Sequence, residues 1–231
     1  MTPAHLDLPL PDGTPATLLA DRALLLPPHD ALVVADVHFG KAATFRARGV
    51  PVPQGTTTDN LRRLEALLAA TGAGTLIFLG DLFHAREAHA RDTLAALRVW
   101  RERHPRIEML LVEGNHDRHA GAPPAALGVR VVQEPFALGS LALCHHPQLV
   151  SGRHVIAGHL HPCVRLYGGA FDSVRLPCFW LREALTLLPA FGEFTGGALI
   201  AREAGDRVIG VADGRLYPLP TLPALSADHA A

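Results

Sequence analysis

Residues 31–38, ALVVADVH, combine the two features that decide the fold: a short apolar run and polar side chains directly after it. A continuous apolar run of about five residues between turn signals is typical of a strand buried on both faces. The same pattern recurs at 75–81, TLIFLGD, which ends in Gly80 and Asp81. The two stretches predict buried strands of an α/β sheet with polar ends at one edge.

Three later apolar runs end in the same way. They are 107–112, followed by Gly114, Asn115, His116 and Asp117; 141–144, followed by His145; and 153–157, followed by Gly158, His159 and His161. Ligands of open α/β sheets bind outside the carboxyl ends of the strands. We therefore expect these polar ends to meet at one edge of a sheet and to form one site.

Helices are predicted between the strands. Leucines at helical spacing indicate a helix from Thr57 or Thr58, as its cap, to about residue 70, and a second helix covers 86–103 before Pro105. Residues 40–54 read as a loop, and 163–217 as short strands and turns with a final strand near 208–212. We expect one domain over 1–217 and a loose tail over 218–231.

Composition limits the possible functions. The 231 residues are 48% hydrophobic and 19% charged, which suits one globular domain with a sizeable core. A net charge of −1 gives no chain-wide basic surface for nucleic acid, so an anionic substrate needs a local site. No apolar run approaches the ~18 residues of a membrane span, and residues 1–13 carry no secretory signal pattern. Three cysteines, too few for a disulfide scaffold, favour a reducing, cytoplasmic location.

The polar ends have the chemistry of metal ligands. Carboxylate, imidazole and amide groups together suit one or two divalent cations of intermediate hardness, whereas structural zinc sites favour thiolates. Asp36 and His38 lie two residues apart, so in a continuing strand both point to one face, and His159 and His161 repeat this spacing. Glycine at 80, 114 and 158 allows tight turns and close approach of the backbone to a ligand.

Together, the five blocks over 31–161 resemble the calcineurin-like metallophosphoesterases. The resemblance implies a four-layer α/β/β/α sandwich with a two-metal site. It implies that Asp36, His38, Asp81 and His161 hold one metal, that Asp81 bridges to a second metal held also by Asn115, His145 and His159, and that His116 is the acid or electrostatic stabiliser.

A more specific resemblance extends over about 8–218. The stretches DVHFGKAATFRARGVPVPQGTT (36–57), GDLFHAR (80–86), CHHP (144–147), GHLHPCV (158–164) and LPCFWLRE…LPAFGEFTGG (176–197) are similar to the ligase-associated DNA end-processing phosphoesterases of bacteria, the PdeM type. This implies manganese-dependent phosphodiester cleavage of DNA ends in repair, beside a DNA ligase and a helicase. Carboxylate and imidazole ligands also admit iron, zinc or cobalt. His145 is assigned as the ligand, with His146 left as the alternative.

Other residues bear on the substrate. His84 gives a Gly-Asp-x-Phe-His block like that of DNA nucleases in this superfamily, although it could instead orient His116 or cap the second helix. Phe39 and Phe45 could stack on bases or pack in the core. Arg118 could touch the substrate phosphate or pair with a carboxylate. Three cations are expected to contact DNA phosphates: Lys41, Arg46 and Arg48. The alternative is that they belong to a solvated loop and contact no substrate.

Two other functions compete with DNA cleavage. The same ligands would serve a small-molecule phosphoesterase that acts on cyclic or dinucleoside phosphates. A non-catalytic protein-binding module on the same fold is a third reading, and the complete set of ligand candidates argues against it. A chain this short has little room for a domain that caps the site, which favours a large, open substrate.

Overall fold

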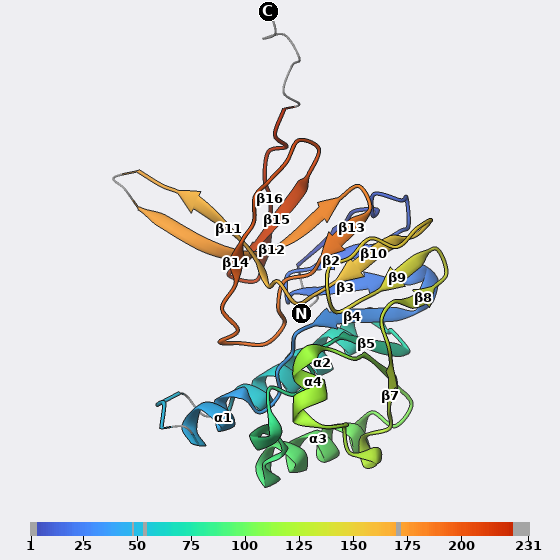
Figure 1. Cartoon of the computed structure of the whole chain (residues 1–231), viewed down its shortest axis with the longest axis vertical. Helices are drawn as coiled ribbons and strands as arrows, with labels where there is room; N and C mark the ends of the chain where they lie inside the picture. The colour runs from blue at the N-terminus through green and yellow to red at the C-terminus, as the bar shows by residue number, and fades with distance from the viewer. Residues whose placement is uncertain (1–3, 48, 53–54, 170–171, 224–231) are drawn as a thin grey trace, which may run out of the picture.

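Two β-sheets face each other, and helices cover the outer face of the first (Figure 1). The computed structural model describes residues 4–47, 49–52, 55–169 and 172–223. The first sheet has seven strands; the β1–β4 pairs are antiparallel, and β4 to β7 run parallel. In spatial order it contains β1 (His5–Asp7), β2 (Thr17–Leu19), β3 (Ala23–Leu26), β4 (Ala31–Ala35), β5 (Thr75–Leu79), β6 (Glu108–Val112) and β7 (Val129–Val132).

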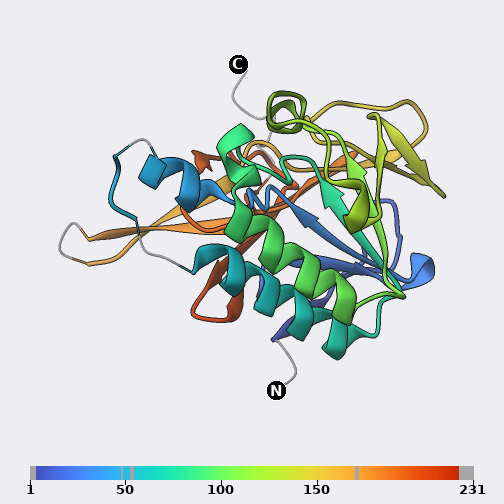
Figure 2. The same cartoon turned by 90° about the horizontal axis from the view of Figure 1, so that it is seen from below.

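Helices α2 (Thr56–Thr71) and α3 (Arg91–Arg103) run side by side across this sheet (Figure 2). Their leucines and Trp100 pack on Phe78 and Leu111 of the sheet, as the helical spacing predicts. The shorter helices are α1 (Lys41–Ala47) and α4 (Asn115–Ala120), with 3-10 turns η1 (Pro27–His29), η2 (Arg86–His89) and η3 (Ala125–Leu127).

The second sheet has nine strands from the later part of the chain. Its main path is β14 (Ala198–Leu199), β11 (Pro162–Tyr167), β12 (Ser173–Arg182), β13 (Leu185–Leu187), β10 (His154–Ala157), β9 (Leu141–Leu143) and β8 (Phe136–Leu138); β15 (Arg207–Ala212) and β16 (Arg215–Pro218) continue from β12. Val33, Ile77, Ile156 and Phe179 belong to the core between the two sheets. A third apolar cluster, with Trp180 and Val208, lies on the second sheet.

The predicted α/β sandwich is confirmed, with differences in detail. On the second sheet, the described residues contribute strands and loops rather than a helical layer. The segment predicted as a loop over 40–54 begins with α1, in which Ala42 and Thr44 are buried. The helix predicted over 86–103 is divided, because the chain is extended at Ala90 between η2 and α3.

The predicted cap of α2 is wrong, since the helix begins after Gly55, in a left-handed conformation, with no side-chain cap. Thr57 Oγ1 instead accepts a hydrogen bond from the Gly40 N–H, at 3.3 Å, and ties α2 to the start of α1. The strand predicted near 208–212 matches β15 but is not the final one, since β16 follows it and ends at Pro218. The rest of the tail predicted from residue 218 lies mostly outside the described residues. The domain boundary stays a prediction. Within the described part of the chain, no helix has the length and apolar character needed to cross a membrane.

Candidate metal centre

The polar ends converge from two sheets, not from one. Asp36, Asp81 and Asn115 follow β4, β5 and β6 of the first sheet, while His145 and His159 follow β9 and β10 of the second. The expectation of a single sheet edge is therefore corrected. The two sheets are joined here, because the Phe191 N–H, just after the second sheet's β13, donates to the Ala35 carbonyl at 2.8 Å.

The glycines that precede the candidate ligands allow these loops to interlock. A Cβ atom at Gly80 would lie 2.0 Å from Nδ1 of His145, far inside contact distance. A Cβ at Gly114 would lie 2.5 Å from Oδ1 of Asp81, and one at Gly158 would lie 2.6 Å from Oδ2 of Asp36. These glycines thus allow close contacts with side chains of neighbouring loops, whereas the close approach to a ligand that the sequence predicts stays a prediction.

Several candidate ligands have a strained backbone. The φ angles are 54° at Asp36, 49° at His38, 50° at Asp81, 68° at His159 and 47° at His161. Non-glycine residues rarely adopt this left-handed region, and such strain collects at functional sites, where the surrounding structure enforces it.

One group of facing donor atoms lies around Asp36. Its Oδ1 is buried and accepts no hydrogen bond from the described residues, although Nε2 of His161 lies 3.3 Å away. Nδ1 of His161 lies 3.1 Å from the Thr195 carbonyl, which must accept its proton. In its neutral form, which is the form that binds metal, the ring turns the lone pair of Nε2 toward Asp36. His38 belongs to the same group as Asp36 and His161, and its Nε2 lies 3.6 Å from Oδ2 of Asp81.

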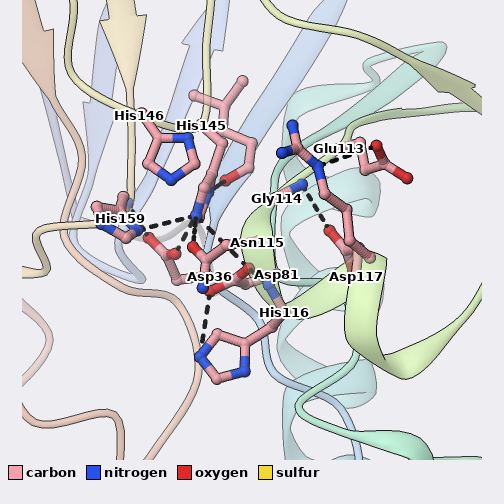
Figure 3. Close-up of polar contacts among 12 residues, drawn as sticks. Asp36, Asp81, Glu113, Gly114, Asn115, His116, Asp117, His145, His146 and His159 are labelled. Carbon is pink, nitrogen blue, oxygen red and sulfur yellow. Dashed lines mark hydrogen bonds and ion pairs between the residues drawn. The ribbon is translucent and has the colours of Figure 1, made fainter.

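A second group surrounds Nε2 of His145 (Figure 3). This nitrogen lies 3.0 Å from Asn115 Oδ1, 3.0 Å from His159 Nδ1 and 3.5 Å from Asp81 Oδ1. Nδ1 of His145 lies 3.1 Å from the Leu79 carbonyl, so the neutral ring carries its proton there and presents a lone pair at Nε2.

These two groups fit divalent cations. Lone pairs crowd together in each, and a cation relieves the repulsion between them. Asp81 faces both groups, Oδ1 toward His145 and Oδ2 toward His38. The clusters of Asp36, His38 and His161 and of Asp36, Asp81 and His145 each have the spacing of metal-binding residues. Two further groups, His38, His84 and His116 and His145, His146 and His159, have similar spacing, so the two-metal assignment that the resemblance implied stays a prediction.

Burial sets the protonation of these groups. It lowers the pKa of His38, with the Lys41 ammonium adding to the effect, and it lowers the pKa of His159. Both shifts favour the neutral imidazole that binds metal. Burial raises the pKa of Asp81 and the neighbouring Asp36 adds to this, while His145 opposes it. Burial would also lower the pKa of His161, but the Asp36 carboxylate outweighs it and the net shift is upward.

The two adjacent histidines have different surroundings. The His145 side chain is fully buried in the cluster, whereas His146 is partly exposed and its Nδ1 lies 2.6 Å from Oε1 of Glu134. Oε2 of Glu134 accepts hydrogen bonds from the backbone N–H groups of both histidines, at 2.7 and 2.9 Å. Burial opposes charge on Glu134, but these bonds keep its pKa below the ordinary value. Sequence reasoning missed Glu134, since nothing in its neighbourhood marks it as part of this site.

Asp117 connects two ligand-bearing loops. Its Oδ1 accepts from the N–H groups of Leu82 and Phe83, at 2.9 and 3.3 Å, and its Oδ2 accepts from Gly114, at 2.9 Å. Burial raises the pKa of Asp117 to about 6 despite these bonds. The carboxylate thereby holds the loop after Asp81 against the start of α4.

His116 lies beside the donor cluster. Its Nδ1 donates to the His84 carbonyl at 2.8 Å, which leaves Nε2 directed toward Oδ2 of Asp81 at 3.9 Å. The side chain is 39% exposed and so is accessible to substrate. The His84 ring stacks on His116, with centroids 5.0 Å apart, and its Nδ1 lies 3.4 Å from Nδ1 of His38. His84 thus touches both imidazoles, and its backbone carbonyl orients His116.

The predicted phosphate-binding cations that the structure describes differ in their surroundings. Lys41, the first residue of α1, is half-buried; burial lowers its pKa, while Asp81 and Asp36 oppose the shift. Arg46 is exposed on the same helix, and Arg48 lies outside the described residues. Arg118 pairs with Glu113 at 3.4 Å, as the alternative reading expected.

The two candidate aromatic residues differ. Phe39 is buried in the core, so base stacking by Phe39 is wrong. Phe45 is partly buried, and its ring meets the edge of His84 at 5.8 Å.

Two of three comparisons with known proteins find matches. The family model of the calcineurin-like phosphoesterases matches residues 30–146. The crystal structure of Pseudomonas putida nuclease MPE is 45% identical, with a TM-score of 0.83 over 93% of this chain and 100% of that one. Yfce, a phosphoesterase from E. coli, is 16% identical over 79% of this chain and 88% of that one, with a TM-score of 0.39. A search of curated proteins gives no match.

The family match covers more than half of the chain, and it includes the loops that carry Asp36, Asp81, Asn115 and His145. The chain therefore belongs to the calcineurin-like phosphoesterases. It is a metal-dependent phosphoester hydrolase, and the family uses divalent metals.

Proposed function

We propose that the protein is a two-metal phosphodiesterase that cleaves DNA at or near its ends. The observation that carries this proposal is the 45% identity to a nuclease over 93% of the chain. The convergence of all seven candidate ligands from two sheets also supports it, because a chain that had lost hydrolysis would not need to keep them.

In this proposal the ligands divide between two metals. Asp36, His38, Asp81 and His161 would hold one ion, and Asp81, Asn115, His145 and His159 would hold the other. Two divalent ions in such a site would activate water near neutral pH and stabilise the charge on the phosphoryl oxygens. Manganese is the proposed metal, with iron or zinc as alternatives that the same oxygen and nitrogen donors accept.

The residues of the chain supply positioning and proton transfer. His116, whose Nδ1–H donates to the His84 carbonyl, would in its protonated form donate a hydrogen bond or a proton from Nε2 to the leaving oxygen. Lys41, at the start of α1, would attract a phosphate of the substrate, and Arg46 would extend this contact along the strand. Arg118 is already paired with Glu113, so its contact with phosphate would require exchange of partners.

A second candidate is a phosphoesterase for cyclic or dinucleoside phosphates. The same metal ligands serve it, and only the width of the bound substrate differs. The partly exposed His116 and His146 favour the larger substrate, because they leave the centre accessible from outside.

One assay separates these functions. The manganese-loaded protein is given single-stranded, nicked and hairpin DNA beside a cyclic nucleotide, a dinucleoside polyphosphate and bis(p-nitrophenyl) phosphate. We expect cleavage of DNA and of the nitrophenyl diester, and none by the Asp81→Asn variant. Turnover of the small nucleotides with intact DNA would instead establish the second candidate.

The resemblance to ligase-associated enzymes leads to a cellular proposal. We propose that the protein works in DNA repair in the cytoplasm, where a DNA ligase and a helicase act on the same ends. Three buried cysteines without disulfides, Cys144, Cys163 and Cys178, fit a reducing compartment. Ligation of blocked DNA ends, with and without the purified protein, tests whether its product is a substrate for the ligase.

A further inference from the structure

An exposed aromatic residue belongs to a loop whose backbone contacts the candidate metal centre. Of the chain's nine phenylalanines, Phe171 lies outside the described residues. Among the others only Phe194 is exposed, with half of its surface accessible to solvent. Phe191, three residues earlier, is fully buried. The loop thus places one aromatic ring in the core and presents the next to solvent.

This loop is attached directly to the site. The Gly192 N–H donates to the Asp36 carbonyl at 3.1 Å, and a Cβ at Gly192 would lie 2.3 Å from the Val37 carbonyl oxygen. On the other side of Phe194, the Thr195 carbonyl accepts from Nδ1 of His161 at 3.1 Å. Phe194 therefore lies between two backbone segments that contact candidate metal ligands.

Ion pairs and hydrogen bonds of the residues on either side of Phe194 also fix this loop. Glu193 forms ion pairs with Arg22 at 2.8 Å and with Arg63 at 3.3 Å. Arg63 donates in addition to the Phe191 carbonyl at 2.9 Å, and its guanidinium lies 4.1 Å from the centre of the Phe191 ring. Thr195 Oγ1 closes the turn by donating to the Gly192 carbonyl at 3.3 Å.

The conformation of Phe194 itself is unfavourable. Its φ angle is 58°, in the left-handed region that a bulky side chain seldom adopts. Exposure of the ring also forgoes the free energy of burying it. A strained, exposed ring on a loop that is anchored on both sides, and whose backbone contacts ligand-bearing segments, favours a contact with substrate.

We propose that Phe194 is a positioning residue whose ring stacks on an unpaired nucleobase next to the scissile phosphate. The inference rests on the proposed polynucleotide substrate and adds the residue that orders it. Stacking on aromatic side chains is the usual way in which proteins hold single-stranded nucleic acid without reading its sequence. The ring would fix the sugar next to the phosphate, whereas the metals and His116 act on the phosphate itself.

The test compares Phe194→Ala, Phe194→Leu and Phe194→Tyr. All three variants keep a Cβ, so each retains the backbone strain. Tyr217→Ala is the matched control, since Tyr217 is an exposed aromatic residue on β16, 38% accessible. Melting temperatures confirm that the variants fold.

The first measurement is kinetic and uses a single-stranded oligonucleotide. We expect Phe194→Ala to raise KM about tenfold while kcat changes less than twofold, because stacking contributes mainly to binding. Phe194→Tyr should keep the wild-type KM, Phe194→Leu should raise KM as Phe194→Ala does, and the control Tyr217→Ala should leave KM unchanged. With an oligonucleotide that carries abasic residues around its single cleavable linkage, wild type and Phe194→Ala should have equal KM values.

The second measurement does not depend on turnover. An oligonucleotide with 2-aminopurine in place of that base should lose fluorescence on binding to wild type and to Phe194→Tyr, but not to Phe194→Ala or Phe194→Leu. Equal KM and equal quenching in wild type and Phe194→Ala would overturn the assignment. Full recovery by Phe194→Leu would also overturn it, and would indicate an apolar protein contact. A wild-type protein that cleaves no polynucleotide would overturn the proposed function itself.

Discussion

Gly80 and His145 lie so close that the imidazole occupies the space where any other residue would carry its side chain: a Cβ at Gly80 would be 2.0 Å from Nδ1 of His145. The two residues come from different sheets, since Gly80 follows β5 and His145 follows β9. The contact fixes the second group of metal donors against the first.

Gly80→Ala adds only one methyl group, but that group would collide with His145 and should therefore displace this candidate metal ligand. We expect bound manganese to fall from two ions toward one and phosphodiesterase activity to fall at least tenfold, as measured by metal analysis and by assay. Gly13→Ala is the control, because Gly13 also has a positive φ, 88° against 71°, but has no atom within 4 Å of its Cβ position. If both variants bind two ions, the close contact does not support the site.

His116→Ala should retain both metals and lose most hydrolysis. A positioned acid or hydrogen-bond donor contributes about 10²–10⁴-fold, so kcat should fall by that range. His84→Ala should have a smaller effect, because the carbonyl that holds His116 belongs to the backbone and remains. Unchanged turnover in His116→Ala would end the proposed role.

Glu134→Ala should weaken metal binding although Glu134 is not itself a proposed ligand. Its carboxylate holds the backbone of His145 and His146, and loss of such supporting bonds lowers metal affinity about 10–100-fold. Glu113→Ala provides the comparison, since Glu113 pairs with Arg118 and Gln133 instead. Manganese titration measures both variants, and equal affinities would contradict the role given to Glu134.

Arg46→Glu should separate DNA from small substrates. Reversal of a charge that contacts a DNA phosphate weakens DNA binding and flattens its salt dependence. We expect the variant to cleave DNA more slowly than wild type, and lowering the salt concentration to accelerate it less than it accelerates wild type. Turnover of bis(p-nitrophenyl) phosphate should be unchanged. The same test applies to Arg48→Glu. A similar loss on both substrates would point to damage at the metal centre.

Acid should destabilise the protein through His154, away from the metal centre. This buried imidazole donates from Nδ1 to the Glu183 carbonyl and accepts at Nε2 from Thr186, and burial lowers its pKa. As the pH falls below ~6.5, His154 takes up a proton in the unfolded chain but not in the native state. Protonation therefore favours the unfolded chain, and the stability that the protein has above pH ~6.5 is progressively lost below it.

Urea unfolding of wild type and His154→Gln between pH 7.5 and 5.5 measures this contribution. We expect the stability difference between wild type and variant to shrink as the pH falls. Comparing the two proteins removes the pH dependence of metal binding, which both share. A difference that stays constant with pH would show that His154 titrates normally.

Local sequence was sufficient for much of the fold. The buried strands β4, β5, β6, β9 and β10 were predicted closely, because continuous apolar runs leave few alternatives. Helix α1 was missed, since glycine, proline and charged residues surround it and its stability comes from packing of Ala42 and Thr44. The break at Ala90 was missed for a related reason, as no glycine or proline marks it.

The sequence by itself determined which groups could form the site, because Asp36, Asp81, Asn115 and His145 each follow a strand whose apolar character fixes where it ends. Only the tertiary structure decided that these groups come from two facing sheets, that His145 is buried among them while the partly exposed His146 pairs with Glu134, and that the loop carrying Phe194 contacts His161 through the Thr195 carbonyl. The reason is physical: a residue's type and its neighbours set local conformation, whereas contacts across more than a hundred residues depend on how the sheets pack.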